Sequence, residues 1–114
     1  MPPSVVVVIR EDPRRSHRAV EALRIALGLS TGENPLSVIL LGQSPLMISE
    51  EPEDIVDGEI MEKYLPSFKY LKIPFSVPIG TSVKFNLDSE FNVRELSEEA
   101  IRSVISGSDR ILVF

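Results

Sequence analysis

Five consecutive β-branched residues, Val5 to Ile9, constrain this chain more than any other feature of its sequence. An uninterrupted run of this kind is typical of a strand buried on both faces, the usual state of a strand in a parallel sheet. The run leads into a mostly apolar helical stretch over residues 14–29. Asp12 is a good N-cap for that helix, and Pro13 suits its first position. The chain therefore opens as a strand–loop–helix unit, and such units bind ligands at the carboxyl ends of their strands.

The same two patterns alternate along the rest of the chain. Continuous apolar runs predict strands over residues 4–9, 36–41, 73–79 and 110–114. Helical spacing predicts helices over residues 14–29 and 98–106, and another that starts near residue 51, is interrupted by Pro66 and is followed by a short turn at 67–71. Ser97 can cap the last helix, and Gly107 can terminate it.

Two regions carry weaker signals. The strand over residues 73–79 contains Pro74 and Pro78, which indicate either a sheet edge or an irregular strand. Residues 83–87 alternate weakly and could form a short extra strand, whereas the closing strand over residues 110–114 is expected to be buried. The segment 81–94 has the least pattern of all, and we expect it to be mobile or engaged in subunit contacts.

Alternating strands and helices predict an α/β fold in three layers, as in flavodoxin-like or Rossmann-like proteins. We expect a mainly parallel sheet of four to five strands with helices on both faces. The length of 114 residues is that of one domain, so residues 1–114 are expected to form a single domain.

Charge and hydropathy exclude several classes of partner. The chain carries 12 basic and 17 acidic side chains, a net charge of −5, and so lacks the basic surface that phosphate contacts need. No apolar run approaches the ~20 residues of a membrane helix. The first residues lack the pattern of a secretion signal. We therefore expect a cytoplasmic protein that binds neither nucleic acid nor a membrane.

Cysteine and histidine usage limits the chemistry. The chain contains no cysteine and one histidine, which excludes disulfides, thiolate chemistry, cysteine-ligated zinc and a histidine-rich metal site. GxGxxG, Walker A and GxSxG motifs are absent from the sequence. Residues 50–62 include seven acids and no base, but their spacing is not that of an EF-hand, and the pattern is typical of a solvated helix face. The sequence predicts no cofactor, no metal and no assignable catalytic residue.

Positive charge gathers at the start of the first predicted helix, at Arg14, Arg15, His17 and Arg18. Cations oppose the helix macrodipole there, but together with the free N–H groups of a helix start they suit a small anion or an acidic loop of a partner. The alternative is that the arginines pair with neighbouring acids or face solvent. Histidine is the side chain that exchanges protons near neutral pH, so His17 could also act as a general acid or base.

Two later loops should open at the same edge of the sheet. The second strand is followed by Gly42 and Gln43, and the third by Gly80 and Thr81. Glycine allows a tight turn or a close approach to a ligand. Three loops that meet at the carboxyl edge of a parallel sheet are typical of a pocket, so we expect these four residues to shape one, unless each glycine only permits a turn.

Three stretches of the chain resemble the DsrE/DsrF-like family. They are residues 17–29, HRAVEALRIALGL, in the first helix, residues 38–42, VILLG, at a strand–glycine step, and residues 108–114, SDRILVF, in the closing strand. The resemblance implies a small α/β fold with a parallel-dominated sheet, and subunits that form dimers, trimers or hexamers. Several members of the family pass persulfide sulfur in tRNA thiolation or dissimilatory sulfur metabolism.

The chain departs from this family at the sulfur-carrying position. Sulfur-carrying members have a cysteine in the loop after the third strand, where this chain reads SVPIGT over residues 76–81. The resemblance therefore implies a protein without sulfurtransferase activity: a non-catalytic subunit, oligomeric with itself or with other DsrE-like chains, or a binding protein for a small anion or a partner. The alternative hypothesis is a small enzyme that acts on an anionic substrate, with His17 as general acid or base.

Overall fold

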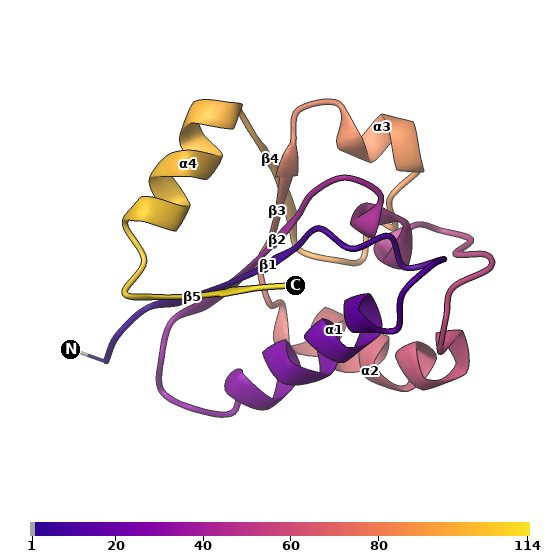
Figure 1. The fold of residues 1–114 in the computed structure, drawn as a ribbon, viewed down its shortest axis with the longest axis horizontal. Coiled ribbons are helices and arrows are strands. Elements are labelled where there is room, and N and C mark those ends of the chain that lie inside the picture. Colours follow the sequence, from indigo (N-terminus) through magenta and orange to yellow (C-terminus); the bar gives the residue numbers. More distant parts are fainter. Residues whose placement is uncertain (1) are drawn as a thin grey trace.

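The computed structural model describes residues 2–114, and within them the strands form one five-stranded sheet in which every pairing is parallel. The strand order is β4-β3-β2-β1-β5 (Figure 1). The strands are β1 (Val5–Ile9), β2 (Leu36–Leu40), β3 (Phe75–Pro78), β4 (Val93–Leu96) and β5 (Arg110–Val113). The helices are α1 (Arg18–Leu29), the 3₁₀ helix η1 (Ser44–Ile48), α2 (Gly58–Leu71), α3 (Thr81–Phe85) and α4 (Glu98–Ser106).

The β-branched run at the start of the chain forms β1, an interior strand. Val5 lies opposite Leu36 of β2 on one side and opposite Arg110 of β5 on the other. All five residues of β1 are buried, as expected for a strand covered on both faces. The predictions of strands at 4–9 and 36–41 are confirmed to within one residue at each end.

Helices cover the two faces of the sheet unequally (Figure 1). α1 and α2 pack on one face, over a large core that includes Val7, Val38 and Phe75. α4 packs on the opposite face, over a smaller cluster that joins Ile101 to Val6. The predicted α/β architecture, a parallel sheet with helices on both faces, is confirmed. In the part of the chain described, no helix is long and apolar enough to cross a membrane.

Three aromatic rings lie at the centre of the larger core. The ring centroids of Phe68 and Phe75 are 5.3 Å apart, and Phe75 meets Phe91 edge-on at 5.8 Å. Lys69 Nζ lies 4.9 Å from the Phe91 ring centroid and donates to an Asp88 carboxylate oxygen at 2.9 Å. This hydrogen bond lowers the pKa of Asp88 and raises the pKa of Lys69 from their ordinary values. The pair ties α2 to the loop before β4.

Replacing Asp88 with Asn should lower the free energy of unfolding at pH 7 by about 1 kcal/mol. Because the pKa of Asp88 is lower in the folded chain, its contribution is present above the ordinary value of 3.8 and is lost as the pH falls through the folded value. Urea unfolding of both proteins, measured from pH 7 downward through pH 3.8, should show the two stabilities converging in acid. Glu53→Gln, at an exposed position, is the control. If the difference in the free energy of unfolding between the two proteins did not shrink in acid, the proposed contribution of the Asp88 carboxylate would be contradicted.

The first helix begins later than its sequence indicates. α1 starts at Arg18 and not at residue 14, and Asp12 is not its N-cap. The Asp12 carboxylate instead accepts the N–H of Arg14 at 2.9 Å, and the N–H of Ser16 donates to the Asp12 carbonyl at 3.1 Å, which closes a turn around the buried Pro13. Side-chain hydrogen bonds to the backbone compete with helix formation in this way.

The prediction of a helix from residue 51 to Pro66 is wrong at both ends. Residues 44–48 form η1, and α2 begins at Gly58 and continues through Pro66 to Leu71. Pro66 is exposed, so the carbonyl that lacks a helical hydrogen bond can be hydrated. The helix therefore tolerates the proline that was expected to interrupt it.

The strand β3 is interior, paired with both β2 and β4, which corrects the expectation of an edge or irregular strand. Its two prolines lie at the two ends of the strand. Pro74 precedes the strand and its carbonyl accepts the N–H of Val38 at 3.0 Å, while Pro78 is the last strand residue. A proline at either end of a strand interrupts none of the central hydrogen bonds.

Residues 81–94 fold as a helix followed by the start of a strand. The extra strand expected at 83–87 is wrong: α3 occupies this region, entered through Gly80 at φ +93° and left through Asn86 at φ +51°. Val83, which contributed to the apparent alternation, is 89% exposed. The strand that follows, β4, carries exposed Arg94 and Glu95 at its centre, so it lacks the apolar run by which strands are recognised.

The last helix is confirmed, and the closing strand is corrected. Ser97 caps α4, because its Oγ accepts the N–H of Ala100 at 3.1 Å, and Gly107 is the C-cap. The strand β5 is not buried: it is the outermost strand beside β1, and all of its residues are exposed. An apolar run alone does not distinguish an interior strand from an edge strand.

Candidate functional site

The loops after β1, β2 and β3 gather at the carboxyl edge of the sheet (Figure 1). The buried hydroxyl of Ser44 lies 2.8 Å from the carbonyl oxygen of Ile9 and joins the loop after β2 to the end of β1. Gly42, at φ +62°, turns beside the carbonyl of Arg10, 3.5 Å from where a Cβ would stand. L side chains rarely adopt this backbone conformation, so glycine at position 42 lets the turn form without strain.

Three of the four predicted loop residues, Gly42, Gly80 and Thr81, line one hollow of about 440 Å³. The fourth, Gln43, is half-buried and does not line it. The N–H of Gly80 donates to the carboxylate of Glu95. An acidic side chain of the protein thus occupies the place that a bound anion would take at this turn.

A larger hollow of about 700 Å³ adjoins the first, and the two share Pro78 and Ile79. We name this larger hollow the α4 groove. Its walls are mostly apolar, and its lining residues are Leu41, Pro78, Ile79, Leu96, Ser97, Glu98, Ile101, Arg102 and Ile105. Sequence reasoning missed this groove. The available signal was the apolar pair Ile101 and Ile105, one helical turn apart on the last helix.

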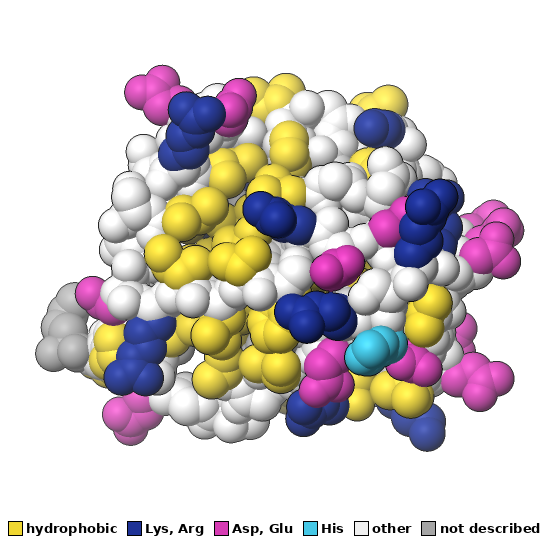
Figure 2. Space-filling model, viewed as in Figure 1, with side chains coloured by type: hydrophobic (Ala, Val, Ile, Leu, Met, Phe, Trp, Pro, Cys, Tyr) yellow, Lys and Arg dark blue, Asp and Glu magenta, His cyan; other side chains and the backbone are white. Residues whose placement is uncertain are grey.

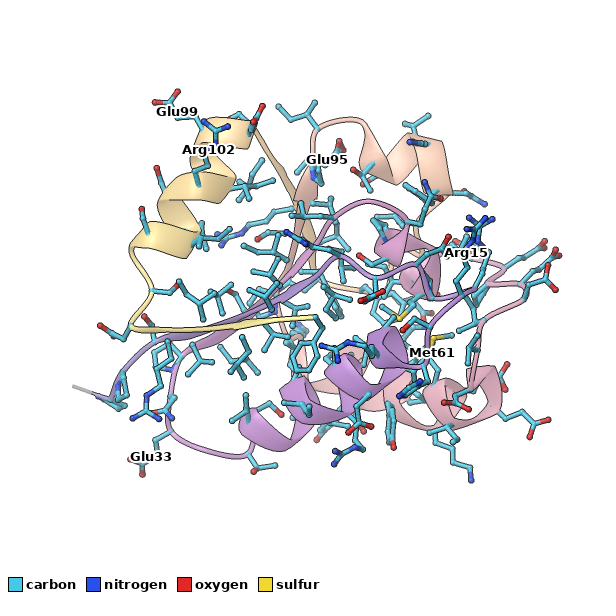
Figure 3. The ribbon with its side chains drawn as sticks, viewed as in Figure 1. Arg15, Glu33, Met61, Glu95, Glu99 and Arg102 are labelled. Carbon is cyan, nitrogen blue, oxygen red and sulfur yellow. The ribbon has the colours of Figure 1, made fainter. Side chains whose placement is uncertain are left out.

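The polar side chains at the rim of the α4 groove are already paired. Arg102 Nη2 donates to Glu98 Oε1 at 2.6 Å, and the Ser97 hydroxyl caps its own helix. Figure 3 shows Arg102 on α4 and Glu95 on β4. Among the lining residues no nucleophile faces a base, so the groove suits an apolar binding partner better than acid–base or nucleophilic chemistry.

The basic cluster at the start of the first helix is paired with acids of the same loop. The Asp12 carboxylate lies 3.2 Å from Arg14 and 3.9 Å from Arg15, and Glu11 lies 3.7 Å from Arg18. The hydrogen bond from Arg14 lowers the pKa of Asp12, and Asp12 raises the pKa of Arg14. Arg15 is 86% exposed and projects from the loop (Figure 3). The cluster lines neither the smaller hollow nor the α4 groove.

The strands that follow β1 are added on one side of it as far as β4, and β5 is added on its other side. Open α/β sheets bind ligands at the crevice where the strand order reverses in this way, and here Phe114 fills that crevice between β1 and β5. Its carbonyl accepts the N–H of Arg10 at 2.6 Å and the N–H of Glu11 at 3.3 Å. The guanidinium of Arg18 lies 5.9 Å from the centroid of its ring. The backbone N–H groups that a ligand would bind at this point are therefore used within the chain.

His17 stands exposed at the N-cap of α1, where its side chain makes no capping hydrogen bond. The neighbouring Ser16 hydroxyl accepts the N–H of Arg18 at 3.1 Å. His17 lines neither of the two hollows. Within residues 2–114, no three His, Asp or Glu side chains come close enough together to hold a metal ion.

Comparison with solved structures finds a counterpart of this fold. The crystal structure of the ychN protein from E. coli matches the chain with a TM-score of 0.76, at 16% sequence identity and over 100% of both chains. The two proteins share a fold. This finding confirms the single-sheet α/β fold predicted from the sequence. No protein-family model matches the chain, and no curated protein matches its sequence.

Proposed function

We propose that this chain is a non-catalytic subunit of an oligomeric DsrE-like assembly and that it binds a partner chain through the α4 groove. In this proposal the assembly serves a cytoplasmic sulfur relay, and another subunit supplies the thiol. The fold shared with the ychN protein supports membership of such an assembly. The absence of cysteine supports a role other than sulfur carriage.

The position of the α4 groove carries the proposal. The groove opens at the end of β3 and the start of the following loop, the region where sulfur-carrying members of the family have a cysteine. Ile79 stands there with 73% of its surface exposed. A large apolar side chain exposed at the mouth of an apolar groove indicates a contact surface for another protein.

Binding of a partner accounts for these residues better than binding of a small anion. Arg14, Arg15 and Arg18 each lie within 4 Å of a carboxylate of their own loop. The Glu95 carboxylate accepts a hydrogen bond from the N–H of Gly80. A small anion would have to displace these carboxylates, whereas an apolar partner surface would displace only water from the groove.

Replacing Ile79 with Glu should dissociate the partner. Because Ile79 is exposed in the isolated chain, the change should leave the free energy of unfolding within about 0.5 kcal/mol, whereas a carboxylate buried in the groove by a partner would be unpaired. Native mass spectrometry of protein purified gently from its own cells should show the partner chain bound to the unchanged chain and absent from Ile79→Glu. Val83→Glu, at a position 89% exposed outside the groove, is the matched control and should keep the complex.

The composition of that complex distinguishes a subunit of a sulfur relay from a protein that binds a small anion. A bound chain of similar fold, with a cysteine after its third strand, would support the sulfur-relay role. A complex unaffected by Ile79→Glu would contradict the groove as the binding surface. A small anion that is bound by the unchanged chain and lost when Arg14 and Arg15 are both replaced by Ala would instead support an anion-binding protein.

A further inference from the structure

The two edge strands of the sheet differ in their protection against pairing with another chain. The strand β4 carries Arg94 and Glu95 at its centre, and both side chains are bound within the chain: Arg94 Nε donates to Ser76 Oγ at 3.0 Å, and Glu95 accepts the N–H of Gly80. The strand β5 carries a charge only at its first residue, Arg110. Central charges are a usual defence of an edge strand against another strand, and β5 lacks that defence.

Alternate backbone groups of β5 are free to bond. The N–H groups of residues 110 and 114 donate to β1-side carbonyls, those of Ser4 and Val8, at 3.0 and 2.8 Å. In a parallel ladder, the residues between such positions turn their N–H and C=O groups to the other side. The groups of Ile111 and Val113 therefore point outward, where the described sheet has no further strand.

The side chains of β5 are uncovered as well. Ile111 and Val113 are 44% and 53% exposed, and their register with Val6 and Val8 places them on the face that carries α4. The helix α4 packs over the cluster of Val6 and Val8 but leaves β5 open. Leu112, on the opposite face, is 37% exposed. Figure 2 shows hydrophobic side chains gathered on the surface between α4 and β5.

We infer that two copies of this chain pair through β5, antiparallel and about a twofold axis that passes beside Leu112. In this register Ile111 lies opposite Val113 of the second copy, and each such pair exchanges both of its backbone hydrogen bonds. The two Leu112 side chains meet as the central pair between them. The twofold axis keeps both copies of α4 on the same face, so the exposed apolar patches of the two copies join into one covered surface.

The charge pattern of β5 favours a second copy of this same strand as its partner. The twofold register places Arg110 opposite Phe114 of the second copy, and not opposite the other Arg110. The two arginines are then four residues apart along the strands, ~14 Å, which exceeds the screening length of about 8 Å at physiological salt. The Phe114 ring already lies 5.9 Å from the guanidinium of Arg18, so its face suits a cation.

This inference shares one premise with the proposed function, that the chain forms an assembly, but it uses a surface separate from the α4 groove.

Sedimentation velocity of the full chain at micromolar concentrations should give a molecular mass of twice 12.7 kDa, the mass of a dimer. Val113→Lys should halve that mass and leave the single copy folded, because the side chain is exposed in one copy. Val113→Pro should weaken the dimer too, since it removes an outward N–H and no bond to β1. Val83→Lys is the control and should remain dimeric.

Amide hydrogen exchange identifies the strand that pairs. The amide of Ile111 should exchange at least tenfold more slowly in the dimer than in Val113→Lys, while the amide of Leu112, bound to β1, stays protected in both. An unchanged chain that is monomeric at all concentrations would overturn the inference, and so would a folded Val113→Lys that remains dimeric. A dimer lost in Ile79→Glu but kept in Val113→Lys would overturn it while leaving the proposed function intact.

Discussion

Replacing Phe75 with Ala should lower the free energy of unfolding by about 3–5 kcal/mol, the largest single effect that we expect in this chain. Phe75 is fully buried on an interior strand, and its ring contacts those of Phe68 and Phe91. The truncation leaves a cavity where α2, β3 and the loop before β4 meet, and three separate elements cannot readily collapse into it. Since a domain of this size is stable by roughly 5–15 kcal/mol, much of that stability would be lost.

Urea unfolding followed by circular dichroism measures this loss. Tyr70→Ala is the matched control, because Tyr70 is an aromatic residue of α2 that is 85% exposed, and its removal should cost less than about 0.5 kcal/mol. A loss below about 1 kcal/mol for Phe75→Ala would contradict the role of the three rings at the centre of the core.

Replacing Ile101 with Ala should release α4 from the sheet. Ile101 is the buried residue of this helix, 6% exposed, and its neighbours Val104 and Ile105 are only partly buried. We expect a loss of about 2–4 kcal/mol, concentrated in α4. Because Ile101 also lines the α4 groove, binding of a partner there should weaken with it.

Amide exchange distinguishes local release of α4 from general destabilisation. In Ile101→Ala the amides of α4 should exchange faster, while those of α1 should keep most of their protection. Arg102→Ala, which breaks only an exposed pair with Glu98, is the control and should cost less than about 0.5 kcal/mol. Equal loss of protection in α1 and α4 would show that α4 does not open as a separate unit.

The strand β1 and the helix α4 illustrate what this sequence could predict. The β-branched run from Val5 to Ile9 matches a strand buried on both faces. Ser97 caps α4 and Gly107 ends it, as their residue types indicate. Each of these features depends on the chemistry of adjacent residues, which a sequence displays directly.

The exposure of the strand β5 and the length of the helix α2 could not be predicted from the sequence. The residues of β5 are nearly as apolar as those of β2, but they are exposed because α4 packs elsewhere on that face. The helix α2 continues through Pro66 because that position faces water. Place in a sheet and direction towards solvent are set by distant contacts, which local patterns do not contain.

The candidate site also has features that the sequence could predict and features that it could not. The glycines at 42 and 80 indicated loops at the carboxyl edge, and the structure brings both to one hollow with Thr81. The pairing of Arg14 with Asp12 depends on side-chain geometry, so the sequence could only offer it as an alternative. The α4 groove joins Ile79 to Ile101 from separate segments, and it exists only once the chain is folded.

The pairing of β1 with β5 joins residues that are synthesised far apart in time. Val5 lies opposite Arg110, and the N–H of Ser4 donates to the Asp109 carboxylate across a separation of 105 residues. A ribosome adds ~5–20 residues per second, so one edge of β1 stays open for roughly 5–20 s after the strand is made. An apolar run without charge is the kind of segment that enters cross-β aggregates. A segment prone to aggregation is thus made about 105 residues before the strand that covers one of its edges, and any slowing of synthesis between the two prolongs its exposure.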